Sequence, residues 1–124
     1  MEQEVYLKGH IPNNDLITKI NYSSILVMAS SYEGFPMVIA EALTVGTPVI
    51  TTDVGSISDV VTNGYNGYLI PKGSSHKIFA EKMAFTLEEI QSFSENALCS
   101  STVFNASAVY NQIKNDLTKA LTPR

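Results

Sequence analysis

An unbroken apolar run, Ile25 to Ala29, constrains the fold of this chain more than any other feature. A run without polar alternation is expected for a strand covered on both faces of a parallel sheet. Polar residues follow it, and Pro36 then suits the first position of a helix, where its missing N–H has no helical partner. No breaker interrupts residues 37–45 before Gly46. We therefore predict a buried strand, a loop and a helix.

The same alternation of strands and helices continues on both sides of this unit. The further predicted elements are strands at Tyr6-Leu7, 49–52 and 67–70, a helix containing Leu16 and Ile20 and capped by Asn13 or Asn14, a short helix over 56–61, an amphipathic helix on Ile78, Phe79, Met83 and Leu87, and helices over 87–98 and 105–121 separated by the polar stretch 100–105. We expect an α/β fold, a partial Rossmann-like three-layer sandwich. Its small, mostly parallel sheet belongs to residues 1–71, and residues 72–124 form a helical tail.

Two carboxylates eight residues apart, Glu33 and Glu41, flank the predicted helix start. Ligands of open α/β sheets collect at the carboxyl ends of the strands, where Glu33 and Asp53 should emerge, and a helix N-terminus attracts anions. Glu41 lies among apolar neighbours, and a buried carboxylate needs hydrogen-bond donors. The two hydroxyls of a ribose would supply them, while Glu33 could accept bonds from a sugar beyond a phosphate. The alternatives are an ordinary surface helix for Glu41 and a loop carboxylate without a role for Glu33.

Three segments in this order carry a family resemblance. They read Ser-Ser-Tyr-Glu-Gly-Phe-Pro-Met-Val-Ile-Ala-Glu-Ala-Leu, Gly-Thr-Pro-Val-Ile-Thr-Thr-Asp-Val-Gly and Asn-Gly-Tyr-Asn-Gly-Tyr-Leu-Ile-Pro. Together they resemble the C-terminal domain of the retaining, nucleotide-sugar-dependent glycosyltransferases of family 4, which have the GT-B fold. The similarity is close from Val5 to Pro71 and loose in the helical tail.

This resemblance implies an enzyme of the hexosyltransferase type that acts in polysaccharide biosynthesis. Glu33 would contact the donor sugar and stabilise the positive charge that develops as the nucleoside diphosphate leaves, and Glu41 would bind the ribose. The sugar and the diphosphate would also meet the backbone of Gly34, Phe35, Pro36 and Met37. The family needs no divalent metal and no cofactor.

The departures from the family pattern lead to further expectations. The Arg and Lys that neutralise the diphosphate have no counterpart upstream of Glu33, nor does the N-terminal domain that binds the acceptor. We therefore expect the chain to be inactive alone and to need that domain or a partner chain. Two family strands between Tyr6-Leu7 and Leu26-Val27 are also missing. The first strand should pair beside Leu26-Val27, detach, or exchange with a second copy, because unpaired edges recruit partners; a homodimer is thus a further prediction.

Composition limits the class of protein. A net charge of −4 with only eight Lys and Arg in 124 residues argues against a nucleic-acid partner. No apolar run reaches the roughly 20 residues of a membrane span. Cys99 is the only cysteine and is expected in the core, so no internal disulfide forms. We expect a cytoplasmic protein, peripheral to the membrane in a full-length enzyme. His10 and His76 lie at no metal-binding spacing.

Two other functional classes stay open. A non-catalytic interaction module derived from a glycosyltransferase would associate with a partner without binding nucleotide. A doubly wound signalling domain would use Asp53 as a phosphoacceptor, but the acidic cluster expected near its first strand is missing.

Overall fold

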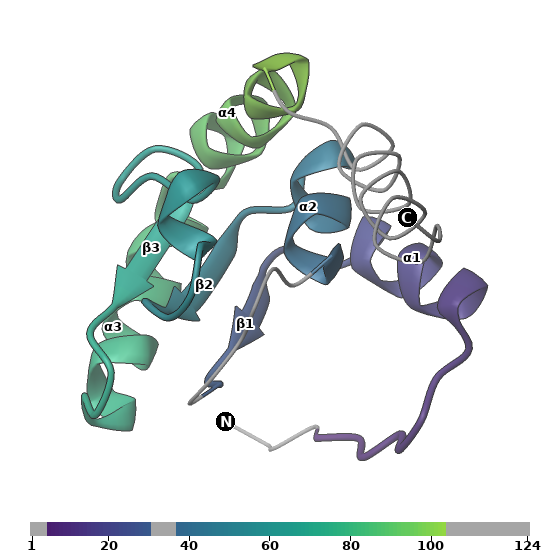
Figure 1. Cartoon of the computed structure of the whole chain (residues 1–124), viewed down its shortest axis with the longest axis horizontal. Helices are drawn as coiled ribbons and strands as arrows, with labels where there is room; N and C mark the ends of the chain where they lie inside the picture. The colour runs from purple at the N-terminus through teal and green to yellow at the C-terminus, as the bar shows by residue number, and fades with distance from the viewer. Residues whose placement is uncertain (1–4, 31–36, 104–124) are drawn as a thin grey trace, which may run out of the picture.

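The computed structural model describes residues 5–30 and 37–103. Helical segments alternate with the three strands, and two helices then end the described part of the chain, as Figure 1 shows. The elements are α1 (Asn13–Asn21), β1 (Leu26–Met28), α2 (Met37–Thr44), β2 (Val49–Thr52), the 3₁₀ turn η1 (Ile57–Asp59), β3 (Gly67–Ile70), α3 (His76–Glu88) and α4 (Ile90–Val103). The predicted helix over 105–121 lies outside the described residues.

The sheet is parallel and has the order β1-β2-β3. Leu26 lies opposite Val49, which lies opposite Gly67, so the three strands end at one common edge. The central strand β2 is buried along its whole length. β1 is shorter than predicted, and Val27 at its middle is 39% exposed. The prediction that this strand is covered on both faces is therefore wrong, because Leu26 and Met28 pack against the core on one face while Val27 on the opposite face is exposed.

Helices pack on both faces of the sheet. On one face, Ile39 and Leu43 of α2 and Ile20 of α1 form a core with Val49. On the other face, the Tyr68 ring of β3 meets two rings from α3 and α4. Its centroid lies 6.2 Å from that of Phe85 and 5.6 Å from that of Phe93. The predicted three-layer α/β arrangement with a small parallel sheet is confirmed.

The segment before α1 departs from the prediction. Tyr6 and Leu7 form no strand, are 71% and 95% exposed, and pair with no described strand. In Figure 1 this segment (purple) runs apart from β1, because it leads into α1, which lies beside α2. Of the three outcomes expected for it, the single chain shows detachment. The predicted cap of α1 is also wrong, since Pro12 precedes the helix and provides no side-chain hydrogen bond.

Helix α4 lies across the amino end of the sheet. The Ser94 hydroxyl donates a 2.7 Å hydrogen bond to the carbonyl of Gly46, which lies in the turn after α2. A methyl group added at Gly46 would lie 3.1 Å from the Leu98 side chain, and Gly46 has a φ of 82°. α2 and α4 therefore meet at close range around this glycine, whose left-handed conformation favours the absence of a side chain.

The buried side chain of Asn66 connects the loop before β3 to α4 at the same end of the sheet. It is 1% exposed, and its amide group donates to the Val60 carbonyl and the Ser100 hydroxyl, both at 2.9 Å. Its side-chain oxygen accepts a 2.8 Å hydrogen bond from the N–H of Thr62. The next residue, Gly67, lies so close to β2 that a methyl group there would be 1.8 Å from the carbonyl oxygen of Val49.

The two long helices correct two predictions. In α3, Met83 and Leu87 of the expected apolar stripe are 36% and 50% exposed, whereas Thr86 is fully buried. The helix is turned because Lys82 and Phe85 pack on the Tyr68 ring. Helix α4 also continues through the start of the polar stretch that was predicted to end it. The Ser100 hydroxyl donates to the Asn96 carbonyl one turn back, which keeps this polar group compatible with a helix.

Candidate functional site

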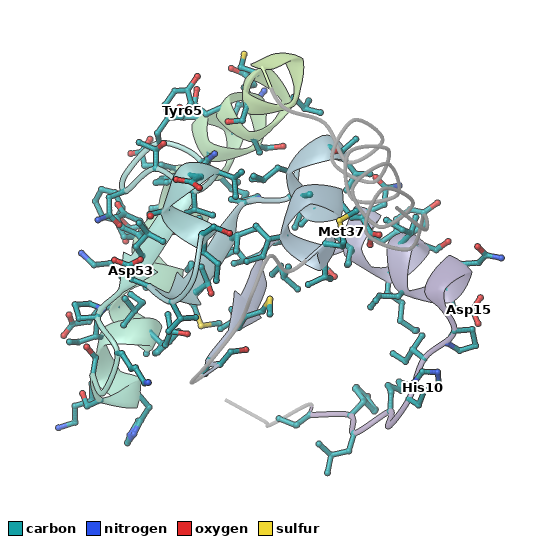
Figure 2. The ribbon with its side chains drawn as sticks, viewed as in Figure 1. His10, Asp15, Met37, Asp53 and Tyr65 are labelled. Carbon is teal, nitrogen blue, oxygen red and sulfur yellow. The ribbon has the colours of Figure 1, made fainter. Side chains whose placement is uncertain are left out.

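The candidate site lies at the carboxyl end of the sheet. β1 leads through Ser30 into residues 31–36, α2 starts at Met37, and Asp53 follows β2 at the same edge. Figure 2 shows Asp53 well apart from Tyr65, which precedes β3 at the amino end. Four of the predicted site residues, Glu33, Gly34, Phe35 and Pro36, lie outside the described residues.

Glu41 is the predicted site residue whose surroundings the structure describes most fully. It lies in α2 between the buried residues Ala40 and Ala42 and is itself half-buried. Desolvation by this burial raises the pKa of the Glu41 carboxyl above its usual value. Among residues 5–30 and 37–103, no side chain donates a hydrogen bond to this carboxylate. The Glu41 carboxylate is thus partly desolvated and has no side-chain donor among these residues.

Helix α2 begins next to this carboxylate. Met37 is its first residue, and Glu41 lies four residues later, about 6 Å along the axis at about 1.5 Å per residue. The first turn of α2 contains no acidic side chain. The positive end of the helix dipole is therefore not neutralised by an acidic side chain within that turn, and a helix N-terminus of this kind can attract an anion.

Asp53 continues β2 by one residue and then leaves the sheet. Its N–H donates a 2.8 Å hydrogen bond to the Ile70 carbonyl, and its side chain is exposed. Gly55 follows with a φ of 59°, a conformation that favours glycine and turns the chain away. Asp53 thus ends the strand through its backbone, and its carboxylate remains accessible at the site edge.

Thr52 is a residue of this edge that the sequence analysis missed. Its hydroxyl donates a hydrogen bond to the carbonyl of Ser30, across from β2 to the exit of β1. The available signal was a hydroxyl on a strand expected to be buried, because buried hydroxyls take hydrogen-bond partners. The partner lies 22 positions away in the chain, so the sequence does not identify it.

Other candidate groups lie away from this edge. Cys99 is exposed, which corrects its predicted place in the core; the helix turns it outward at a hollow of about 230 Å³ near the amino end of the sheet. His10 and His76 are exposed. In the described part of the chain, no three His, Cys, Asp or Glu residues gather as a metal site would require. Within the same residues, no helix has both the length and the apolar character to cross a membrane.

Comparison with known proteins gives a family. The family model described as "Glycosyl transferases group 1" matches residues 1–97. Among curated relatives, the GtfA subunit of the UDP-N-acetylglucosamine–peptide N-acetylglucosaminyltransferase of Streptococcus pneumoniae is 33% identical over 98 residues, which are 78% of this chain and 19% of the relative. The capsular polysaccharide biosynthesis glycosyltransferase CapM of Staphylococcus aureus is 39% identical over 79 residues, 64% of this chain and 20% of the relative.

A solved structure agrees with these matches. The pneumococcal O-GlcNAc transferase GtfA, crystallised with UDP and GlcNAc, superposes with a TM-score of 0.71 and 26% identity. The superposition covers 95% of this chain and 24% of that protein. The chain thus spans about a fifth to a quarter of the length of the proteins it resembles here.

Proposed function

The chain belongs to the glycosyl transferases of group 1, and we propose that it forms the donor-binding part of a retaining, family 4 type glycosyltransferase. Its ligand is a nucleotide diphosphate sugar. The observation that carries this proposal is the half-buried Glu41 carboxylate, one turn inside a helix that begins at the carboxyl end of a parallel sheet. The pneumococcal relative solved with UDP and GlcNAc has the same fold over nearly the whole chain.

Each part of the proposed site has one task. Glu41 accepts hydrogen bonds from the two ribose hydroxyls, which replace the water it loses by burial. The N-terminus of α2, with the backbone of residues 34–37, receives the diphosphate. Glu33 lies against the donor sugar. As the bond between the anomeric carbon and the diphosphate oxygen breaks, Glu33 stabilises the positive charge on the sugar and the helix stabilises the negative charge on the leaving group.

A pH dependence follows from the role of Glu41. Hydrogen bonds from ribose hydroxyls favour the ionised carboxylate, whereas burial in the free protein favours its protonated form. Nucleotide binding should therefore strengthen as the pH rises through the raised pKa of Glu41. Replacing Glu41 with glutamine should remove this component of the pH profile.

Calorimetric titration of the chain with UDP tests the assignment. Glu41→Gln should weaken binding about tenfold, because a charge-assisted hydrogen bond is lost. Glu81→Gln is the matched control, since Glu81 lies exposed on α3, and its affinity should stay within about twofold. Equal affinity of the wild type and Glu41→Gln would contradict the proposed role of Glu41.

We propose further that the chain alone transfers no sugar. A donor site on one domain needs an opposing wall that holds the acceptor and excludes water, and this chain matches about a fifth of its relatives' length. Incubation with UDP-glucose should release no UDP above the rate in buffer. Release that depends on Glu33 would show that the chain is a complete catalyst.

The exposed edge of β1 supports a partner at this side of the sheet. Val27 of β1 is 39% exposed there. In the separate segment that precedes α1, Val5, Tyr6 and Leu7 are 74%, 71% and 95% exposed. We propose that the acceptor domain, a partner chain or a second copy covers this edge. We also propose that the protein acts in the cytoplasm. Light scattering should show association that Val27→Asp weakens, because Val27 is the exposed apolar residue of β1. Association without any UDP binding would favour the second candidate function, a non-catalytic interaction module.

A further inference from the structure

We propose that Thr52 is a positioning residue for the sugar half of the donor site. This inference rests on the proposed function and adds to it a residue that is itself outside the predicted ligand contacts. The hydroxyl of Thr52 holds the carbonyl of Ser30, the last described residue before the segment that carries Glu33. Thr52 therefore fixes the point from which that segment starts.

The hydrogen bond stands where the sheet ladder stops. Backbone pairing between β1 and β2 runs from Leu26 opposite Val49 to Met28 opposite Thr51. Thr52 and Ser30 lie beyond this last pair, and there a side-chain hydroxyl takes the place of a backbone donor. The link therefore extends the attachment of β1 to β2 toward the candidate site.

This link matters because β1 is short and lies at the edge of the described sheet. The strand has three residues, and β2 is its one neighbour among the described strands. Thr52 is only 7% exposed, so water competes little for its hydrogen bond. A bond that is protected from water restrains the exit of this strand at Ser30 more than an exposed bond would.

Helix α2, which follows residues 31–36 in the chain, is held independently of Thr52. Met37 begins α2, and Val38 and Ile39 pack in the core next to it. Ribose recognition by Glu41 depends on α2 and not on Thr52. Loss of the Thr52 hydroxyl should therefore weaken contacts to the sugar and leave contacts to the nucleotide largely intact.

Thr51 provides a matched control on the same strand. It is fully buried, as Thr52 nearly is, and it also bears a hydroxyl that donates to a backbone carbonyl. That bond goes to the adjacent residue, Thr52, at 3.2 Å and does not reach β1. Thr51→Val and Thr52→Val thus make the same chemical change in similar burial, and only the second removes the link between strands.

The experiment compares UDP and UDP-glucose affinities of the full chain for the wild type, Thr52→Val, Thr52→Ser and Thr51→Val. The preference for UDP-glucose over UDP should fall about fivefold in Thr52→Val, the loss expected for one hydrogen bond. Thr52→Ser retains the hydroxyl and should restore the preference to within about twofold. Thr51→Val should leave it unchanged, although both valine variants lower the melting temperature.

Amide hydrogen exchange of residues 28–30 supplies a readout that needs no ligand. Exchange should accelerate in Thr52→Val and not in Thr51→Val. An unchanged UDP-glucose preference in Thr52→Val, or the same loss in both valine variants, overturns the positioning role. If the wild type binds no UDP, the proposed function fails. The exchange data then decide separately whether Thr52 holds the exit of β1, and equal exchange in the two variants overturns that as well.

Discussion

The two ends of the parallel sheet are built in different ways. At the amino end, the buried Asn66 holds a loop and α4 together, and Ser94 ties α4 to the end of α2. At the carboxyl end, the Thr52 hydroxyl bonds to the Ser30 carbonyl. The side chain of Asp53 is exposed there, and that of Glu41 is half-buried. The comparison teaches that, within residues 5–30 and 37–103, the amino end holds a denser set of side-chain links between elements, whereas the carboxyl end presents the two carboxylates.

Gly67→Ala should have the largest effect of any single change at the amino end. The added methyl group would lie 1.8 Å from the Val49 carbonyl, so β2 and β3 must separate. We expect a loss of about 4 kcal/mol or more, or failure to fold, measured by urea unfolding. Gly73→Ala is the control, because a methyl group there meets no atom within 4 Å. Its cost should be about 1 kcal/mol, from the left-handed backbone alone.

Asn66→Ala should cause the second-largest loss of stability. It removes the partners of the Thr62 N–H and the Val60 carbonyl inside the protein, at an expected cost of about 3 kcal/mol in urea unfolding. Asn63→Ala is the control. Asn63 is exposed, and its side chain accepts one hydrogen bond from the Leu69 N–H, so this change should cost about 1 kcal/mol. Where Asn66→Ala remains folded, its UDP affinity should match the wild type. A loss of affinity in the folded variant would show that the two ends are coupled.

Glu41→Gln should slightly stabilise the folded chain at pH 7, in contrast to the two destabilising changes above. Burial raises the pKa of Glu41 in the folded state, so the stability linked to this group is fully present below the unfolded pKa of about 4.5. That stability is lost as the pH rises through the folded pKa. Glutamine carries no charge, and the variant should melt slightly above the wild type at pH 7 and level with it at acid pH. A lower melting temperature of Glu41→Gln at pH 7 would indicate that the ionised carboxylate has a stabilising partner.

Asp53→Ala should have the smallest effect. Its exposed side chain leaves the structure unchanged when truncated, and alanine keeps the N–H that bonds to Ile70. The free energy of unfolding should stay within about 0.5 kcal/mol of the wild type. A larger loss would place a stabilising contact at the carboxyl end and weaken the contrast between the two ends.

The sequence predicted those parts of the fold that local rules determine. β2, β3 and α2 were found because apolar runs end at glycine and proline, as the chain around Gly46 shows. The unpaired state of Tyr6-Leu7 and the exposure of β1 depend on neighbours that lie far away in the chain. The buried face of α3 was missed because Thr86 is buried in place of Leu87 once Phe85 packs on Tyr68.

Part of the candidate site could be predicted because it also depends on local rules. The position of Glu41 in a helix that starts at the carboxyl end follows from Pro36 and the apolar residues after it, and the structure agrees on the helix. The roles of Glu33, Gly34, Phe35, Pro36, Met37 and Glu41 stay predictions. The link from Thr52 to Ser30 joins residues 22 positions apart, and no local pattern encodes it.

The close approach of two strands at Gly67 also limits how this sequence can change over generations. Every residue except glycine carries a β-carbon, and at this position a β-carbon overlaps a carbonyl of the neighbouring strand. A nucleotide change in the glycine codon that alters the amino acid would thus be removed by selection wherever the folded domain is needed. In a library of all single substitutions, position 67 should tolerate no replacement, although it lies at the opposite end of the sheet from the candidate site.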